Sequence, residues 1–125
     1  MNLKDLLGEA PFVCGPETSL TEVARAMEES DLEVAAVVEG LQLMGLVTES
    51  DLRRAVALGV DVDKTLVADF MGKDPDTFDP DLDVWDAGTW IAESGYRHLP
   101  VVDDDNKLLG VVSVRELLKA LVDTV

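Results

Sequence analysis

Two motifs in the sequence place a hydroxyl side chain three residues before a carboxylate: Thr48 with Asp51, and Ser113 with Glu116. Each pair follows a short apolar segment typical of a strand and precedes a helical pattern. The pair therefore lies at a helix N-terminus, where backbone N–H groups and the helix dipole favour a phosphate. A carboxylate placed there can also accept hydrogen bonds from both hydroxyls of a ribose. The same spacing is a capping box that needs no ligand, and both interpretations stay open at this point.

A basic pair, Arg97 and His98, precedes an apolar segment in the second half of the chain. The guanidinium fork of Arg97 suits a phosphate. His98 is the single histidine, and a packing or edge role explains it as well as phosphate binding does. Four further basic residues fall on predicted helices and are interpreted as solvated faces: Arg53, Arg54, Arg115 and Lys119.

An internal repeat organises the whole chain. At an offset of 64 residues Pro16 falls on Pro80, and after a one-residue insertion near Asp104 the offset becomes 65 and Gly45 falls on Gly110. Two copies of one structural unit therefore make up the chain, and we assign them to residues 1–62 and 63–125.

Each copy predicts the same order of elements: an extended segment, an amphipathic helix, two strands and a second helix. The expected helices are 20–30 and 84–93, with further helices beginning after 48 and after 113, and the expected strands are 34–38, 43–47, 99–102 and 108–112. Glu39 and Gly40 are the predicted turn of the first hairpin. About sixty residues bury little surface alone, so we expect the copies to pack about a pseudo-two-fold axis that creates two related clefts.

These motifs resemble those of one known family. Gly45-Leu-Val-Thr-Glu-Ser-Asp51-Leu is similar to the strand-to-helix signature of CBS domains, and Gly110-Val-Val-Ser-Val-Arg-Glu116-Leu is its second copy. Val67-Ala-Asp-Phe-Met71, followed by Asp74-Pro75, looks like the beginning of a CBS repeat, and Arg97-His-Leu-Pro-Val-Val102 looks like its first hairpin strand. The resemblance covers nearly the whole chain.

The resemblance implies an α/β (α+β) fold of tandem β-α-β-β-α repeats and a module that binds AMP, ADP, ATP or S-adenosylmethionine. It assigns ribose and phosphate contacts to Thr48 and Asp51 in the first copy. In the second copy it assigns them to Ser113, Arg97 and His98, with Glu116 standing where the family has Asp. The first copy has Glu33-Val34 at the place of the basic pair. We expect unequal clefts, with a ribose held better by Asp51 than by Glu116.

Composition narrows the class of partner. The 125 residues include 26 acidic and 10 basic side chains, a formal net charge of −16. A field of this sign repels phosphodiester backbones and anionic bilayers, so we expect neither nucleic acid nor a membrane as a partner. Cys14 is the single cysteine, which rules out an intramolecular disulfide and favours a reducing, cytoplasmic location. One cysteine and one histidine hardly supply a zinc site, so no metal is expected.

Two non-catalytic functions remain open. The sequence has no Ser-His-Asp order, no phosphate-loop glycines and no redox cysteine pair, so we expect neither enzymatic activity nor a cofactor. The first function is a nucleotide sensor that reports to a regulated protein whose identity the sequence does not contain. The alternative is a dimeric interaction module that binds no nucleotide. A homodimer is expected in both cases because the last helix carries abundant apolar surface: Leu117, Leu118, Leu121 and Val122.

Overall fold

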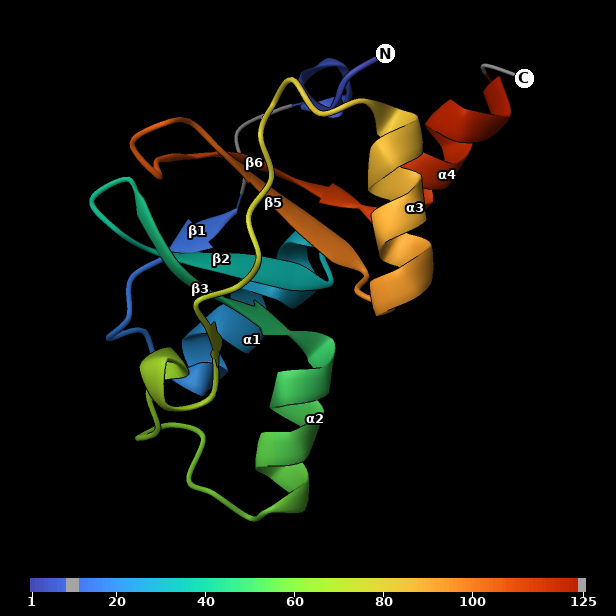
Figure 1. The fold of residues 1–125 in the computed structure, drawn as a ribbon. Coiled ribbons are helices and arrows are strands. Elements are labelled where there is room, and N and C mark those ends of the chain that lie inside the picture. Colours follow the sequence, from blue (N-terminus) through green and yellow to red (C-terminus); the bar gives the residue numbers. More distant parts are fainter. Residues whose placement is uncertain (9–11, 124–125) are drawn as a thin grey trace. The chain divides into compact units, whose positions relative to one another are not determined.

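The chain folds into two compact units, seen in a computed structural model that describes residues 1–8 and 12–123 (Figure 1). The first-repeat unit is Phe12–Pro75. The second-repeat unit combines residues 76–123 with residues 1–8. The boundary at residues 62 and 63 stays a prediction about the repeats, since the grouping in space assigns the N-terminal segment to the second unit.

The first-repeat unit is a four-stranded sheet with two helices. Its elements are β1 (Val13–Cys14), α1 (Leu20–Ser30), β2 (Val34–Glu39), β3 (Gln42–Thr48), α2 (Glu49–Ala57), the 3-10 turn η2 (Val67–Asp69) and β4 (Gly72–Lys73). The strand order is β1-β2-β3-β4, with β1 parallel to β2 and the other pairs antiparallel. The predicted β-α-β-β-α order is therefore present in the first copy.

Local sequence explains where α1 begins and which face it buries. The Ser19 side chain accepts a hydrogen bond from the backbone N–H of Glu22 at 3.1 Å, which caps the first turn. Apolar residues at helical spacing then meet the alternating apolar residues of the sheet. The buried cluster of this unit consists of Leu20, Val23, Met27, Ala35, Val37, Val47, Ala55 and Val67.

The hairpin turn between β2 and β3 lies one residue later than predicted. Glu39 pairs with Gln42, so the two turn residues are Gly40 and Leu41, and not Glu39 and Gly40. Gly40 takes a φ of +64°, which glycine adopts without steric cost. The ladder therefore runs to Glu39 because the residue with left-handed backbone freedom follows it.

The second-repeat unit repeats this plan with a shorter first strand. It contains the 3-10 turn η1 (Leu3–Leu6), α3 (Val84–Ser94), β5 (His98–Val102), β6 (Leu108–Ser113) and α4 (Val114–Asp123), with α3 and α4 side by side (Figure 1). The extended segment of this copy is reduced to one parallel bridge between Phe78 and Val101. Its buried cluster consists of Leu3, Phe78, Val84, Ala87, Leu99, Val101, Val112 and Leu117.

The two hairpins share one irregularity, which confirms the repeat in three dimensions. In the first, the pairing register shifts between Val37 and Val38. In the second, it shifts between Val101 and Val102. A bulge inserts one unpaired residue and bends the strand, and its recurrence at the aligned position shows that both copies use the same strand geometry.

Each repeat begins with a leading segment, residues 3–7 in the first and 67–71 in the second, and each leading segment packs in the unit formed by the other repeat. Residues 3–7 belong to the second-repeat unit and residues 67–71 to the first. Leu3 and Val67 are fully buried in the respective cores. Each leading segment also approaches a strand glycine: a Cβ on Gly45 would lie 2.7 Å from the Met71 sulfur, and a Cβ on Gly110 would lie 2.7 Å from a Leu7 methyl.

The apolar surface differs in part from the sequence expectation. On α4, Leu117 is buried and Leu121 packs against the core, whereas Leu118 and Val122 are exposed at 55% and 71%. Of the four residues predicted to offer a dimer surface, two are therefore occupied by the unit itself. Among the described residues, no helix has both the length and the apolar composition needed to cross a bilayer.

Candidate functional site

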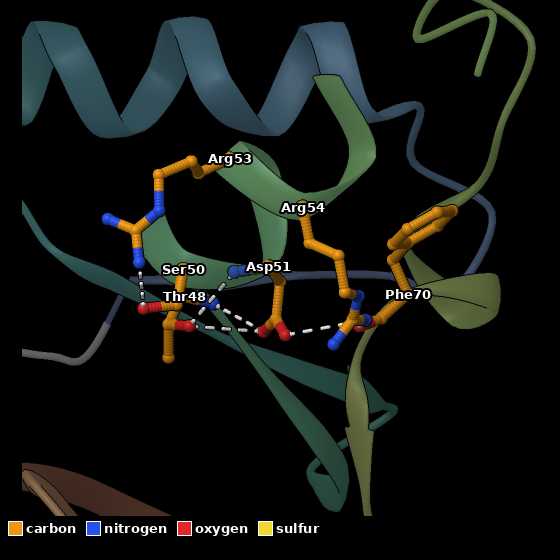
Figure 2. A network of polar contacts seen from close by, with 6 residues as sticks. All are labelled: Thr48, Ser50, Asp51, Arg53, Arg54 and Phe70. Atoms are coloured by element: carbon orange, nitrogen blue, oxygen red, sulfur yellow. Dashed lines mark hydrogen bonds and ion pairs between the residues drawn. The ribbon is translucent and has the colours of Figure 1, made fainter. Parts of the chain in front are cut away.

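Thr48 and Asp51 form a reciprocal hydrogen-bonded pair at the start of α2 (Figure 2). Asp51 Oδ2 accepts from the Thr48 backbone N–H at 2.9 Å and from its hydroxyl at 3.2 Å. The Asp51 backbone N–H in turn donates to Thr48 Oγ1 at 3.4 Å. The capping box that the spacing allows is therefore present. It uses only one of the two carboxylate oxygens of Asp51.

The second carboxylate oxygen of Asp51 faces Arg54, as Figure 2 shows. Arg54 Nη2 lies 3.7 Å from Asp51 Oδ1, and the Asp51 side chain is only 16% exposed. This distance makes an ion pair but is too long for a hydrogen bond. Arg54 was expected on a solvated face, and its side chain is indeed 56% exposed, but that expectation did not include its ion pair with Asp51. The i, i+3 spacing from Asp51 on one helix was the available signal.

Arg54 is itself held by a segment from outside its helix. Its Nη2 donates to the backbone carbonyl of Phe70 at 3.2 Å, and its guanidinium carbon lies 5.2 Å from the centre of the Phe70 ring. Within the described part of the chain, the one hydrogen bond of the neighbouring Arg53 side chain goes to the Ser50 hydroxyl, at 3.4 Å on the exposed face (Figure 2). The two adjacent arginines therefore have different surroundings.

Ser113 and Glu116 close the start of α4 in the same way. Glu116 Oε1 accepts from the Ser113 backbone N–H at 3.3 Å and from its hydroxyl at 3.0 Å, and the Glu116 N–H donates to Ser113 Oγ at 3.1 Å. The extra methylene of Glu116 does not prevent this closure. Unlike the partly buried Asp51, however, Glu116 is exposed.

Arg97 and His98 lead into the same helix start. His98 is half-buried at the beginning of β5 and pairs with Ser113 across the ladder. The carbonyl of the exposed Arg97 accepts from the N–H of Val114 at 2.8 Å. The structure thus brings together the four site residues predicted in the second copy, while Thr48 and Asp51 belong to the first-repeat unit.

The first copy reproduces this backbone arrangement without the basic side chains. Val34 pairs with Thr48, and the carbonyl of Glu33 accepts from the N–H of Glu49 at 3.2 Å. Glu33-Val34 therefore occupies the place of Arg97-His98, as the repeat predicts. The two candidate sets differ in charge: an acidic residue precedes the hairpin in one and a basic residue in the other.

Two further groups bear on the chemistry available. Burial raises the pKa of the Cys14 thiol, although a hydrogen bond with Thr18 opposes the shift. A thiol of raised pKa is a poor nucleophile. In the described part of the chain, no group of three or more His, Cys, Asp or Glu side chains is arranged to hold a metal ion.

Comparison with known proteins identifies the family. The CBS domain family matches residues 3–58 and again residues 67–123. The chain belongs to the CBS domain family. This CBS pair is 34% identical over 113 residues to an uncharacterized 17.7 kDa protein of Acidianus ambivalens, covering 90% of the chain and 68% of that protein. It spans 54% of a longer relative from Methanopyrus kandleri.

Solved structures share the fold over the whole length of the CBS pair. The CBS domain protein NE2398 superimposes with a TM-score of 0.88 at 29% identity, and the match covers 98% of both chains. PAE2072 from Pyrobaculum aerophilum, solved in complex with AMP, gives 0.87 at 23% identity, with 98% and 99% covered. The CBS pair of MJ0100, solved with 5′-methylthioadenosine and S-adenosyl-L-methionine, gives 0.88 at 21% identity, with 100% and 98% covered.

Proposed function

We propose that this CBS pair is a non-catalytic regulatory module that binds an adenosine-type nucleotide and signals the bound state to a protein partner. The observation that carries the proposal is the Thr48–Asp51 arrangement at the start of α2, in which Asp51 Oδ2 is used by the cap and Oδ1 lies 3.7 Å from Arg54 in a long ion pair. Complexes of related folds with AMP and S-adenosyl-L-methionine support the class of ligand.

The chemistry of each set fits a different part of such a ligand. Asp51 Oδ1 can accept from a ribose hydroxyl, because no hydrogen bond to it is found among the described residues. The N–H groups at the start of α2 and α4 favour a phosphate. On a chain with a net charge of −16, attraction for an anionic ligand has to come from nearby cations, and Arg97 is such a cation in the second set.

Isothermal titration calorimetry with AMP, ADP, ATP and S-adenosylmethionine tests the ligand directly. We expect saturable binding of at least one of them and none of inorganic phosphate at the same concentration. Asp51→Asn should weaken the binding of that ligand, whereas Asp104→Asn, which removes the same charge from an exposed turn, should not. Absence of heat and of thermal stabilisation with all four adenosine compounds would reject the proposal.

A second function rests on the exposed apolar residues of α4. Leu118 and Val122 are exposed at 55% and 71%, and both lie outside the buried cluster of the second-repeat unit. They favour an interaction module that pairs with another copy of the chain through this helix. Sedimentation equilibrium should give a dimer that Leu118→Lys converts to a monomer, while Leu41→Lys, on an exposed hairpin turn, leaves it dimeric. A purely monomeric wild-type chain at micromolar concentration would reject the dimer.

A further inference from the structure

We infer that Arg54 is a positioning residue for Asp51, fixing the carboxylate oxygen that a ribose would use, and that only the first copy has this device. The inference rests on the proposed function, which assigns Asp51 to the sugar. Arg54 itself contacts no ribose in this arrangement. It acts through the orientation and the charge of the carboxylate.

The orientation of Asp51 is determined from both sides. Thr48 holds Oδ2 with two hydrogen bonds, and Arg54 lies 3.7 Å from Oδ1 on the opposite side (Figure 2). With Oδ2 held alone, the carboxylate can still tilt about that oxygen. The attraction of the guanidinium limits this tilt, so Oδ1 stays where a sugar diol can reach it.

Arg54 can do this because a second element restrains it. A long side chain on a solvated helix face loses rotamer freedom when it pairs, which cancels much of the attraction. Here the Phe70 carbonyl and ring hold the guanidinium before any ligand binds. Phe70 is in turn fixed by its own leading segment, where the Val67 N–H donates to the Thr18 carbonyl at 2.8 Å and the Val67 side chain is fully buried.

The charge of Arg54 acts in the same direction. A nucleotide that approaches Asp51 brings phosphate toward a carboxylate on a strongly acidic chain. The guanidinium at 3.7 Å compensates the charge of Asp51 locally. A nucleoside, which has no phosphate, should depend on Arg54 through orientation alone.

The second copy lacks both parts of the device. At the offsets of the repeat, Lys119 stands at the place of Arg54 and Leu6 at the place of Phe70. A lysine has no planar fork, and leucine has no ring face for a cation. Among the described residues, no ion pair joins Lys119 to Glu116.

The experiment compares adenosine with 2′-deoxyadenosine, because their affinity ratio reports the diol contact and a merely structural role would lower both affinities alike. Titration calorimetry on the wild type should show a preference for adenosine. In Arg54→Ala we expect adenosine affinity to fall about two- to fivefold, the range of a partly exposed ion pair. The preference over 2′-deoxyadenosine should shrink with it, and Arg54→Lys should restore part of it.

Arg53→Ala is the matched control, since it removes the same charge from the adjacent position on α2 and should leave the ratio unchanged. Phe70→Leu copies the second repeat while keeping Asp51 and Arg54, and should lower the preference less than Arg54→Ala does. A wild-type chain that binds adenosine, with a ratio unchanged in Arg54→Ala or equally reduced in Arg53→Ala, overturns this inference alone. A wild-type chain that binds no adenosine compound overturns the proposed function together with it.

Discussion

The backbone N–H of Leu3 donates a hydrogen bond of 2.9 Å to the carbonyl of Leu82. The related bond, 64 residues further along, joins the N–H of Val67 to the carbonyl of Thr18 at 2.8 Å. Each leading segment is thus bound to the residues just before the first helix of the other copy. The core of the second-repeat unit therefore includes Leu3 from the start of the first repeat, and the core of the first-repeat unit includes Val67 from the start of the second.

The packing of the leading segments predicts that Leu3→Ala destabilises the second-repeat unit, although Leu3 is encoded at the start of the first copy. Its side chain is fully buried, so the cavity should lower the free energy of unfolding by about 2–5 kcal/mol. Hydrogen exchange should become faster in α3 and α4 before α1. Leu41→Ala, at a position 63% exposed, is the control and should change little. Faster hydrogen exchange confined to α1 and α2 would contradict the packing of residues 3–7 in the second-repeat unit.

The two strand glycines should differ in their tolerance of a methyl group. A Cβ at Gly45 would lie 2.6 Å from the Gly72 carbonyl oxygen, whereas a Cβ at Gly110 meets the end of the Leu7 side chain. Backbone cannot move aside as a side chain can, so Gly45→Ala should cost about 1–3 kcal/mol and Gly110→Ala less. Urea denaturation measures both. Gly15→Ala, where a Cβ would meet no atom within 4 Å, is the reference. Equal losses of stability in Gly45→Ala and Gly110→Ala would contradict the expected difference between backbone and side chain.

Asp51→Ala and Glu116→Ala should have unequal effects on AMP affinity. Both changes remove the carboxylate of a capping box, so the loss of the cap is common to them and the difference in affinity reports the ligand. Loss of the partly buried Asp51 should weaken AMP by about tenfold, since a diol left unpaired costs ~1–3 kcal/mol. The exposed Glu116 should contribute less. Calorimetric titrations that give the same loss for both variants would remove the proposed inequality.

The half-buried thiol of Cys14 predicts a dependence of stability on alkaline pH. Burial raises its pKa in the folded chain, so the unfolded chain deprotonates first as the pH increases. The contribution to stability is therefore complete below the unfolded pKa and is lost as the pH rises through the folded pKa. Iodoacetamide should alkylate the folded protein more slowly than an unstructured cysteine peptide at mildly alkaline pH. Equal rates would indicate an accessible thiolate, and Cys14→Ser should lose the alkaline decline.

Short-range patterns in the sequence determine much of this protein. Ser19 followed by apolar residues at helical spacing predicts α1 at Leu20–Ser30, because a cap and a periodicity are contained within one element. The spacing of Thr48 and Asp51 likewise predicts their contact, since three residues at a helix start bring the side chains together. The repeat and its CBS motifs predicted the element order of the first copy, and that of the second except for its first strand, which is reduced to one bridge.

Only the tertiary structure decided which segment each element contacts. Arg54 contacts Phe70 sixteen residues later, and Leu3 enters the core that contains Leu117. Periodicity shows that a face must be buried but does not specify the surface that buries it. The burial of apolar side chains is not directional, so the sequence of a leading segment does not tell which of the two cores it enters. In both units a glycine, Gly45 or Gly110, leaves room for the leading segment to approach the strand, because it has no Cβ.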